Sequence, residues 1–264
     1  MMRPRFVWAV LVKEARDLLA NRLLLGAVVF PALVFAAIPT GIVAFIELNE
    51  LDPAQLGQIE QYISQFPDLE PKLAAQGFIV VNFLAYFLLI PAMVPMAIAT
   101  QSIIGEKTAR SLEPQLATPI EVSELMAGKA LAAATPAVLA TWAVFVLYGL
   151  VNGAIADPAL TRLVFNDEWR VAMVSLVPLI CLLSVMLGII VSARVNDART
   201  AQQIGGFIVL PVIGVAVAGF FSGQATFSIQ QVLIGDIVVG LLIAASLVVG
   251  SWIFEREQIL TRLG

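Results

Sequence analysis

Beyond the amino-terminal arm and the first outer loop, the side chains that could do chemistry are densest in one polar stretch, residues 102–129, SIIGEKTARSLEPQLATPIEVSELMAGK. It separates two runs that are too apolar to face water. The chain has no histidine, which excludes histidine-based zinc sites, Ser-His triads and haem ligation by histidine. The one cysteine, Cys181, lies inside an apolar run, where packing is its expected role. Since these kinds of chemistry are excluded, we expect the stretch to be a docking surface.

The centre of this stretch has the pattern of a short helix. Ser111 can cap its start, Pro114 fits its first turn, and Pro119 ends it. Leu112 and Leu116, four residues apart, share one side. We expect the helix to lie crosswise and to dock on something. An ordinary loop between two spans is the alternative, but it would not need the leucine pair or the two prolines.

The elements that carry this stretch are predicted to cross a membrane. The chain is 60% hydrophobic and 13% charged, with a mean hydropathy of +0.94, whereas soluble domains are about 25% charged. Six apolar runs have the length of a membrane helix. They are residues 24–46, 78–98, 131–153, 171–191, 204–221 and 234–254. We predict an all-α membrane protein whose residues 1–264 form one transmembrane domain.

Basic residues predict the orientation. Twelve lie on the side of the termini, and three lie on the other side, namely Lys72, Arg162 and Arg170. The positive-inside rule therefore places both termini and the polar stretch, residues 101–129, in the cytoplasm. The net charge of −4 comes from the outer loops, so it does not indicate a nucleic-acid partner.

The amino-terminal arm, residues 1–22, is predicted to be an amphipathic helix in the membrane interface. One helical face carries apolar side chains: Val7, Leu11 and Leu18. Another carries charged ones: Lys13, Arg16 and Asp17. Trp8 suits the level of the lipid headgroups. The alternative is an arm that only anchors the chain.

Two outer connections complete the predicted topology. Residues 47–77 form an acidic outer loop that contains a short amphipathic helix ending at Pro67, and a solvated lid without a ligand is the expected role. Residues 222–236 are polar but uncharged up to Asp236, which suggests a re-entrant element in the outer leaflet. The spans also contain seven prolines that can bend them and few ionisable groups, so the energy for any transport should come from elsewhere.

The sequence GEKTARSLEPQLATPIEVSELMAGK resembles the signature of permease subunits of the type-2 ABC exporter family. The matching residues are Gly105-Glu106-Lys107, Leu112-Glu113, Leu116 to Ile120, Ser123-Glu124-Leu125 and Gly128-Lys129. The arm is similar to the family's opening pattern at Lys13, Glu14, Asp17, Asn21 and Arg22, and SARVNDARTAQQIGGFIVLP and EREQILTRLG fit its later segments. Arg110-Ser111 departs from the Gly-Thr that relatives often have.

This resemblance implies that the polar stretch holds a coupling helix that contacts a separate ATPase subunit. The implied coupling residues are Gly105, Glu106, Lys107, Arg110, Leu112, Glu113, Leu116, Thr118 and Pro119. The implied connecting arm contains Val7, Leu11, Lys13, Glu14, Asp17 and Leu18. The chain has no phosphate-binding loop, since AGKA at Gly128 lacks the upstream glycine and the following Ser/Thr. It should therefore bind no cofactor itself and should not be an enzyme.

The resemblance further implies an assembly of two permeases and two ATPases that bind ATP and Mg. The second permease would be another copy or a paralogue, and the membrane a prokaryotic plasma (inner) membrane. Two other functions stay open. One is an intramembrane lipid-modifying enzyme that uses Asp197, although no downstream pair of aspartates follows at the required spacing. The other is a passive channel or scaffold, which would leave the docking-type stretch unexplained. The transported substrate is not readable from the sequence.

Overall fold

The structure, a computed structural model, describes residues 3–49, 60, 63–64, 66–109, 122–195, 197, 199–201, 203–204, 206–207 and 228–261. All secondary-structure elements within these residues are helical. They are α1 (Pro4–Ala20), α2 (Arg22–Leu48), α4 (Pro71–Leu84), η1 (Ala85–Leu88), α5 (Leu89–Thr108), α7 (Val122–Ile155), α8 (Pro158–Val164), α9 (Asp167–Val174), α10 (Leu176–Arg194) and α12 (Ile229–Thr261). The predicted all-α class is confirmed.

Five stretches of the described chain are long and apolar enough to cross a membrane. They are Val28–Leu48, Pro71–Thr108, Ala127–Ile155, Asp167–Ser192 and Ile229–Gly250. These stretches match the predicted first, second, third, fourth and sixth spans. The predicted fifth span, residues 204–221, falls almost entirely outside the described residues, so six spans stay a prediction.

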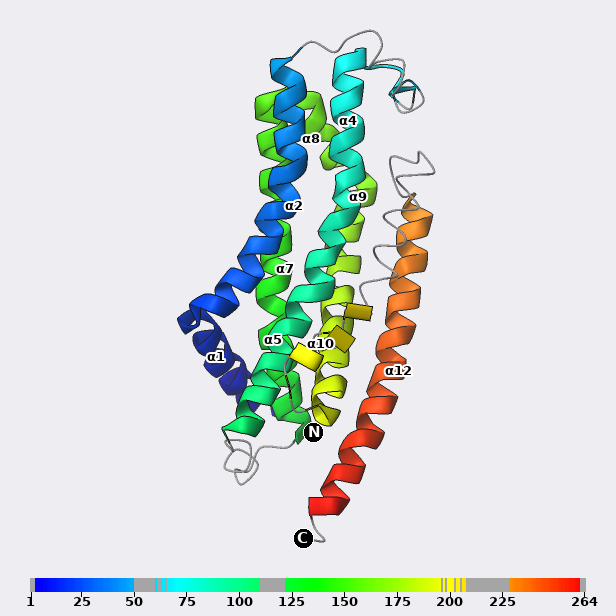
Figure 1. The fold of residues 1–264 in the computed structure, drawn as a ribbon. Helices are drawn as coiled ribbons and strands as arrows, with labels where there is room; N and C mark the ends of the chain where they lie inside the picture. The colour runs from blue at the N-terminus through cyan, green and yellow to red at the C-terminus, as the bar shows by residue number, and fades with distance from the viewer. Residues whose placement is uncertain are drawn as a thin grey trace.

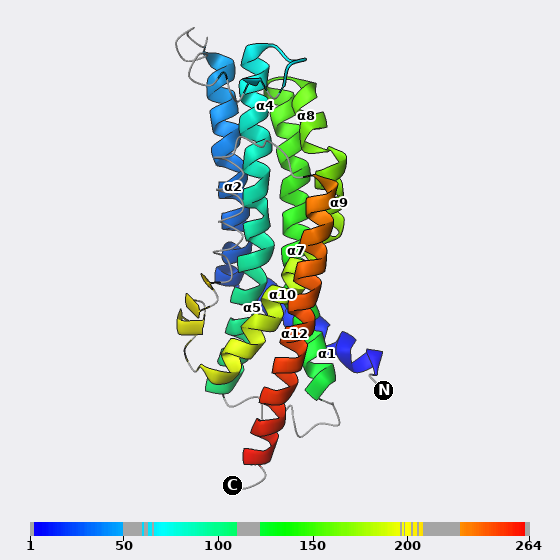
Figure 2. The ribbon, with the colours of Figure 1, turned by 90° about the vertical axis from the view of Figure 1, so that its right-hand side faces the viewer.

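The long helices run side by side: α2 and α7 run away from the end at which α1 begins, and α4–η1–α5, α10 and α12 run towards it (Figure 1). The start of α1, the end of α5, the start of α7 and the end of α12 all lie at one end of the bundle, which we call the α1 end. The run α4–η1–α5 is the most enclosed. In its most apolar stretch 78% of the residues are buried within the protein, whereas the same share is 17% in α2 and in α12. Figure 2 shows α12 lying along α10 and α9. Exposed apolar side chains on α2 and α12, such as Phe30 and Leu241, suit a lipid environment.

Prolines explain two irregularities in these runs. Pro91 has no N–H and its ring crowds the carbonyl of Phe87, and the helix tightens to a 3₁₀ turn over Ala85–Leu88. Pro178 likewise leaves the carbonyl of Val174 without its helical donor, and the fourth run breaks at Ser175 between α9 and α10. These two prolines interrupt the regular α-helix, whereas Pro31, Pro39, Pro95 and Pro136 lie inside continuous helices.

Several predicted boundaries are wrong because helices extend beyond the most apolar residues. Helix α4 begins at Pro71, so residues 71–77 of the predicted outer loop 47–77 are helical. Helix α12 begins at Ile229, so the predicted re-entrant connection 222–236 is an ordinary helix from that residue on. Helix α7 begins at Val122, nine residues before the predicted start of the third span at residue 131. The predicted outer helix before Pro67 falls mostly outside the described residues.

Polar side chains link the helices within the bundle. The hydroxyl of Ser184 on α10 donates to the carbonyl of Ala92 on α5 at 2.5 Å, and that of Tyr148 on α7 donates to the carbonyl of Val80 on α4 at 3.1 Å. Hydrogen bonds of this kind replace the hydrophobic driving force that lipid cannot supply. Gly188 allows α10 to lie close to α5, since a Cβ there would meet Ala99 and Met96 at 3.3 Å.

We predict that Gly188→Leu destabilises the bundle because the larger side chain must push α10 away from α5. Overpacking of this kind costs about 1–3 kcal/mol. The measurement is the thermal unfolding temperature of the purified protein in detergent. Gly41→Leu on α2 is the matched control, since a Cβ at Gly41 meets nothing within 4 Å. Equal unfolding temperatures for the two variants would show that α10 can move away from α5 without a loss of stability.

Candidate functional site

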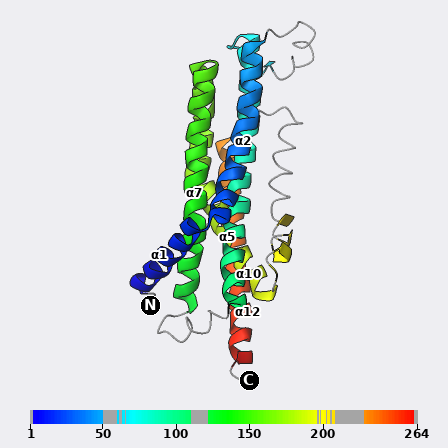
Figure 3. The ribbon, with the colours of Figure 1, turned by 60° about the vertical axis from the view of Figure 1, so that its left-hand side comes forward.

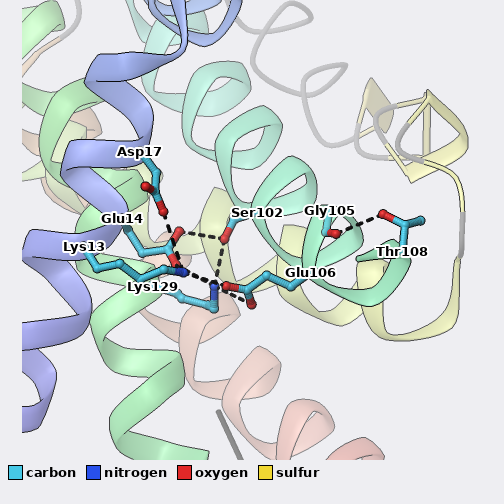
Figure 4. A network of polar contacts seen from close by, with 8 residues as sticks. All are labelled: Lys13, Glu14, Asp17, Ser102, Gly105, Glu106, Thr108 and Lys129. Atoms are coloured by element: carbon cyan, nitrogen blue, oxygen red, sulfur yellow. Dashed lines mark hydrogen bonds and ion pairs between the residues drawn. The ribbon is translucent and has the colours of Figure 1, made fainter. Parts of the chain in front are cut away.

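A buried group of charged side chains joins three helices at the α1 end (Figure 4). Its centre is Lys129 on α7, whose side chain is 3% exposed. The ammonium lies 2.8 Å from a carboxylate oxygen of Glu14 on α1 and 2.8 Å from one of Glu106 on α5. It also donates to the hydroxyl of Ser102 at 2.9 Å. A buried ammonium needs such partners, because leaving water without them costs several kcal/mol.

Lys13 on α1 balances the charge of this group. Its ammonium lies 2.9 Å from Glu106 and 3.1 Å from Glu14, and Ser102 donates to Glu14 at 2.8 Å. Two ammonium groups thus face two carboxylates. We call Lys13, Glu14, Ser102, Glu106 and Lys129 the buried network, in which Lys13 lies at the exposed edge. Because its charges compensate, it can remain in a largely apolar surrounding.

The contacts shift the pKa values of the two arm residues in opposite directions. Burial would raise the pKa of Glu14, but the hydrogen bond and charge of Lys129 hold it below its ordinary value. Burial would lower the pKa of Lys13, but hydrogen bonds to Glu106 and Glu14 hold it above its ordinary value. Both side chains are therefore charged at neutral pH.

A second contact holds the start of α1 against the start of α7. The carboxylate of Glu124 is fully buried and accepts hydrogen bonds from the backbone N–H of Arg3 at 2.6 Å and from its guanidinium at 3.0 Å. Between this pair and the buried network the helices nearly touch, because a Cβ at Gly128 would lie 2.6 Å from that of Val10. Figure 3 shows α1 crossing this part of α7.

The last turn of α5 also reaches α10. The ammonium of Lys107 donates to the carbonyl of Ser192 at 2.6 Å, near the end of α10 at Arg194. A cation is favourable there because the carboxyl end of a helix carries partial negative charge. The end of α5 is therefore attached to α1, α7 and α10.

The structure divides the predicted coupling residues into two groups. Gly105, Glu106 and Lys107 lie on the last turns of α5, where Glu106 is buried in the network and Gly105 is exposed. The remaining six lie outside the described residues, namely Arg110, Leu112, Glu113, Leu116, Thr118 and Pro119. The carboxylate of Glu106 faces α1 and α7, so its described contacts are internal to the chain.

The arm forms the predicted helix, but its sides are used differently from the expectation. Leu18 is buried and Val7 and Leu11 are half-buried, within a helix that packs on α7. Glu14 also points into the protein, and Asp17 lies 3.7 Å from Lys13 at the exposed edge. Four further site members were not among the predicted site residues: Arg3, Ser102, Glu124 and Lys129. Glu124 and Lys129 could have been recognised from the sequence, because each is a charged residue just before the apolar run that begins at residue 131.

The chain was compared with known families and proteins. The family model described as "ABC-2 family transporter protein" matches residues 8–235, which include the whole buried network. The chain belongs to the ABC-2 transporter family. A search of curated proteins gave no match. The permease is a multi-pass membrane component of an ABC transporter and is not itself the ATPase.

We predict that Lys129→Met strongly destabilises this permease, because the two buried carboxylates would then share Lys13 alone. Removing one partner of a buried ion pair costs about 3–5 kcal/mol. The unfolding temperature in detergent is the measurement. Lys72→Met is the matched control, because Lys72 and Glu47 form a half-exposed pair at 3.5 Å and such pairs contribute only about 0–1 kcal/mol. Similar losses for both variants would contradict a special role of the network.

A pH dependence follows from the lowered pKa of Glu14. Its carboxylate stabilises the folded state above its ordinary pKa of 4.5, and this contribution is lost as the pH falls through the lower folded value. The unfolding temperature of the wild type should therefore exceed that of Glu14→Gln near pH 7, and the difference should shrink below about pH 4. If the difference in unfolding temperature stayed constant on acidification, the effect of the substitution would not be due to the charge of Glu14.

Proposed function

We propose that this permease is the membrane-spanning subunit of an ATP-driven exporter. Two copies, or one copy and a paralogue, form the translocation pathway in a prokaryotic plasma membrane. Separate ATPase subunits bind ATP and Mg and dock on the cytoplasmic polar stretch. The permease contributes the pathway and the docking segment, and its own residues bind no nucleotide.

One observation carries the proposal: both helices that flank residues 110–121 are held by ion pairs to the same arm. Helix α5 ends at Thr108 and is held to α1 through Glu106 and Lys13. Helix α7 begins at Val122 and is held to α1 through Glu124 and Arg3. A force on the segment between them therefore acts on three helices together.

These contacts favour rigid movement of the α1 end. Separating α1, α5 and α7 would leave Glu14, Glu106 or Lys129 charged, buried and unpaired, which costs several kcal/mol. The joint movement of the three helices costs no such contact. We therefore propose that closure of the two ATPases moves this end as a unit. The enclosed run α4–η1–α5 then transmits the motion towards the outer half of the bundle.

The charge distribution supports a cytoplasmic position of the α1 end. Basic residues of α1 and of the adjoining ends of α5, α7 and α10 lie there, including Lys107, Lys129 and Arg194. The opposite end carries Lys72, Arg162 and Arg170 on α4, α8 and α9. This asymmetry agrees with the positive-inside rule.

The alternative of a lipid-modifying enzyme receives less support. Asp197, its candidate residue, accepts hydrogen bonds from the backbone N–H and the hydroxyl of Thr200, both at 2.9 Å. This is the geometry of a helix cap. The hydrogen bond from the Thr200 backbone also lowers the pKa of Asp197, as capping does. The contacts of Asp197 thus have a structural explanation.

The experiment that tests the proposal is Leu116→Asp. If Leu116 is buried against the ATPase, a carboxylate there must lose its water without gaining a partner, and truncation of such an anchor alone costs about 2 kcal/mol or more. We expect the variant to insert in the membrane but to lose the co-purifying ATPase and the stimulated ATP hydrolysis. Both are measured on the affinity-purified complex.

Leu48→Asp is the matched control, because Leu48 ends α2 at the opposite end of the bundle and is 86% exposed. This variant should retain the ATPase. Wild-type levels of ATPase and turnover with Leu116→Asp would mean that residues 110–121 are a simple connection. Failure of the wild-type chain to co-purify with any ATPase would contradict the function itself.

A further inference from the structure

Helix α1 turns its apolar side towards the protein. Val10 contacts Gly128 on α7, Glu14 enters the buried network, and Leu18 is buried. These three residues are spaced by four, so they form one continuous stripe along the helix. The stripe is occupied by α7 and α5. The membrane interface must therefore meet a different side of α1.

The opposite side of α1 combines cations with an indole. Arg5, Trp8, Val12 and Arg16 are spaced by three, four and four residues, which places them on one face. Both arginines are exposed, and Trp8 is 65% exposed. Within the described part of the chain, neither guanidinium forms an ion pair. We call these four residues the outer face of α1.

Among the residues that the structure describes, no carboxylate forms an ion pair with the arginines of this face. The nearby carboxylates of Glu14 and Glu106 are neutralised by Lys13 and Lys129, and that of Glu124 by Arg3. The remaining acid of α1, Asp17, lies on the side of Lys13. The two exposed arginines therefore give the outer face a positive potential, which attracts anions.

The position of α1 along the chain places this face near the headgroup layer. The helix ends at Ala20, Asn21 adopts an extended conformation, and α2 begins at Arg22. The first apolar run begins at residue 24, three residues after Asn21, so α1 ends next to the point where the chain enters the hydrocarbon layer.

We propose that the outer face of α1 binds anionic phospholipid headgroups. The planar guanidinium groups of Arg5 and Arg16 suit phosphate oxygens, to which arginine can donate two parallel hydrogen bonds. Trp8 between them lies at the boundary of headgroups and acyl chains, where indoles are favoured. Helix α1 is thus held by α7 on one side and by anionic lipid on the other.

The test uses quenching of Trp8 fluorescence by brominated lipids. The full-length permease is reconstituted in mixed bilayers in which either phosphatidylglycerol or phosphatidylcholine is brominated. The signal of Trp8 is the difference between wild type and Trp8→Phe, so the other tryptophans stay in place. We expect brominated phosphatidylglycerol to quench Trp8 more strongly. Each arginine should contribute up to about five-fold preference, which corresponds to about 1 kcal/mol per basic residue near an anionic surface.

The arginine variants decide the outcome. The double variant Arg5→Gln and Arg16→Gln should be quenched almost equally by the two lipids. The control is the double variant Arg162→Gln and Arg170→Gln at the other end of the bundle, which should keep the stronger quenching by brominated phosphatidylglycerol. Equal quenching by both lipids in the wild type would overturn the proposal. Loss of Trp8 quenching when the co-purified ATPase is bound would also overturn it and would assign the outer face to the ATPase. Unchanged quenching in the complex supports the lipid site.

Discussion

The buried ammonium of Lys129 constrains the whole α1 end of the permease. It lies 2.8 Å from both Glu14 and Glu106, on two different helices. An ammonium this deeply buried is tolerated only while both the charge and the hydrogen bonds are satisfied. Separating α1 or α5 from α7 would therefore cause a large loss of stability.

Close packing next to Lys129 makes the ion pairs possible. Gly128 has no side chain, so α1 approaches until Val10 contacts α7. Glu14 lies one turn beyond Val10 on the same side of α1, and this brings its carboxylate to Lys129. A larger residue at position 128 would push α1 outwards and would lengthen these ion pairs. The glycine and the lysine thus act as one structural unit.

The permease places its charged contacts and its apolar surface in different regions. The ion pairs that join three helices lie at the α1 end, whereas α2 and α12 expose apolar side chains along the bundle. The central run α4–η1–α5 connects the regions, since it is enclosed by its neighbours and ends in the buried network. Such a division suits the proposed function, in which the α1 end acts on the part of the bundle within the membrane.

The sequence alone determined the class of structure and the family. Apolar runs of membrane length predict helices whatever their partners, because a backbone in lipid must satisfy its hydrogen bonds within the segment. The motifs around Glu106 and Lys129 were sufficient to identify a permease, which the family match confirms. The periodicity of the arm also predicted a helix over most of Pro4–Ala20.

Only the tertiary structure decided what each face of α1 contacts. An apolar stripe can be buried against lipid or against another helix, and periodicity does not distinguish these environments because both are apolar. The sequence likewise does not pair Lys13 with Glu106, which is 93 residues away, or Lys129 with Glu14, which is 115 residues away. Those pairs form because Gly128 lets two helices approach, and the cost of burying unpaired charge then selects the partners.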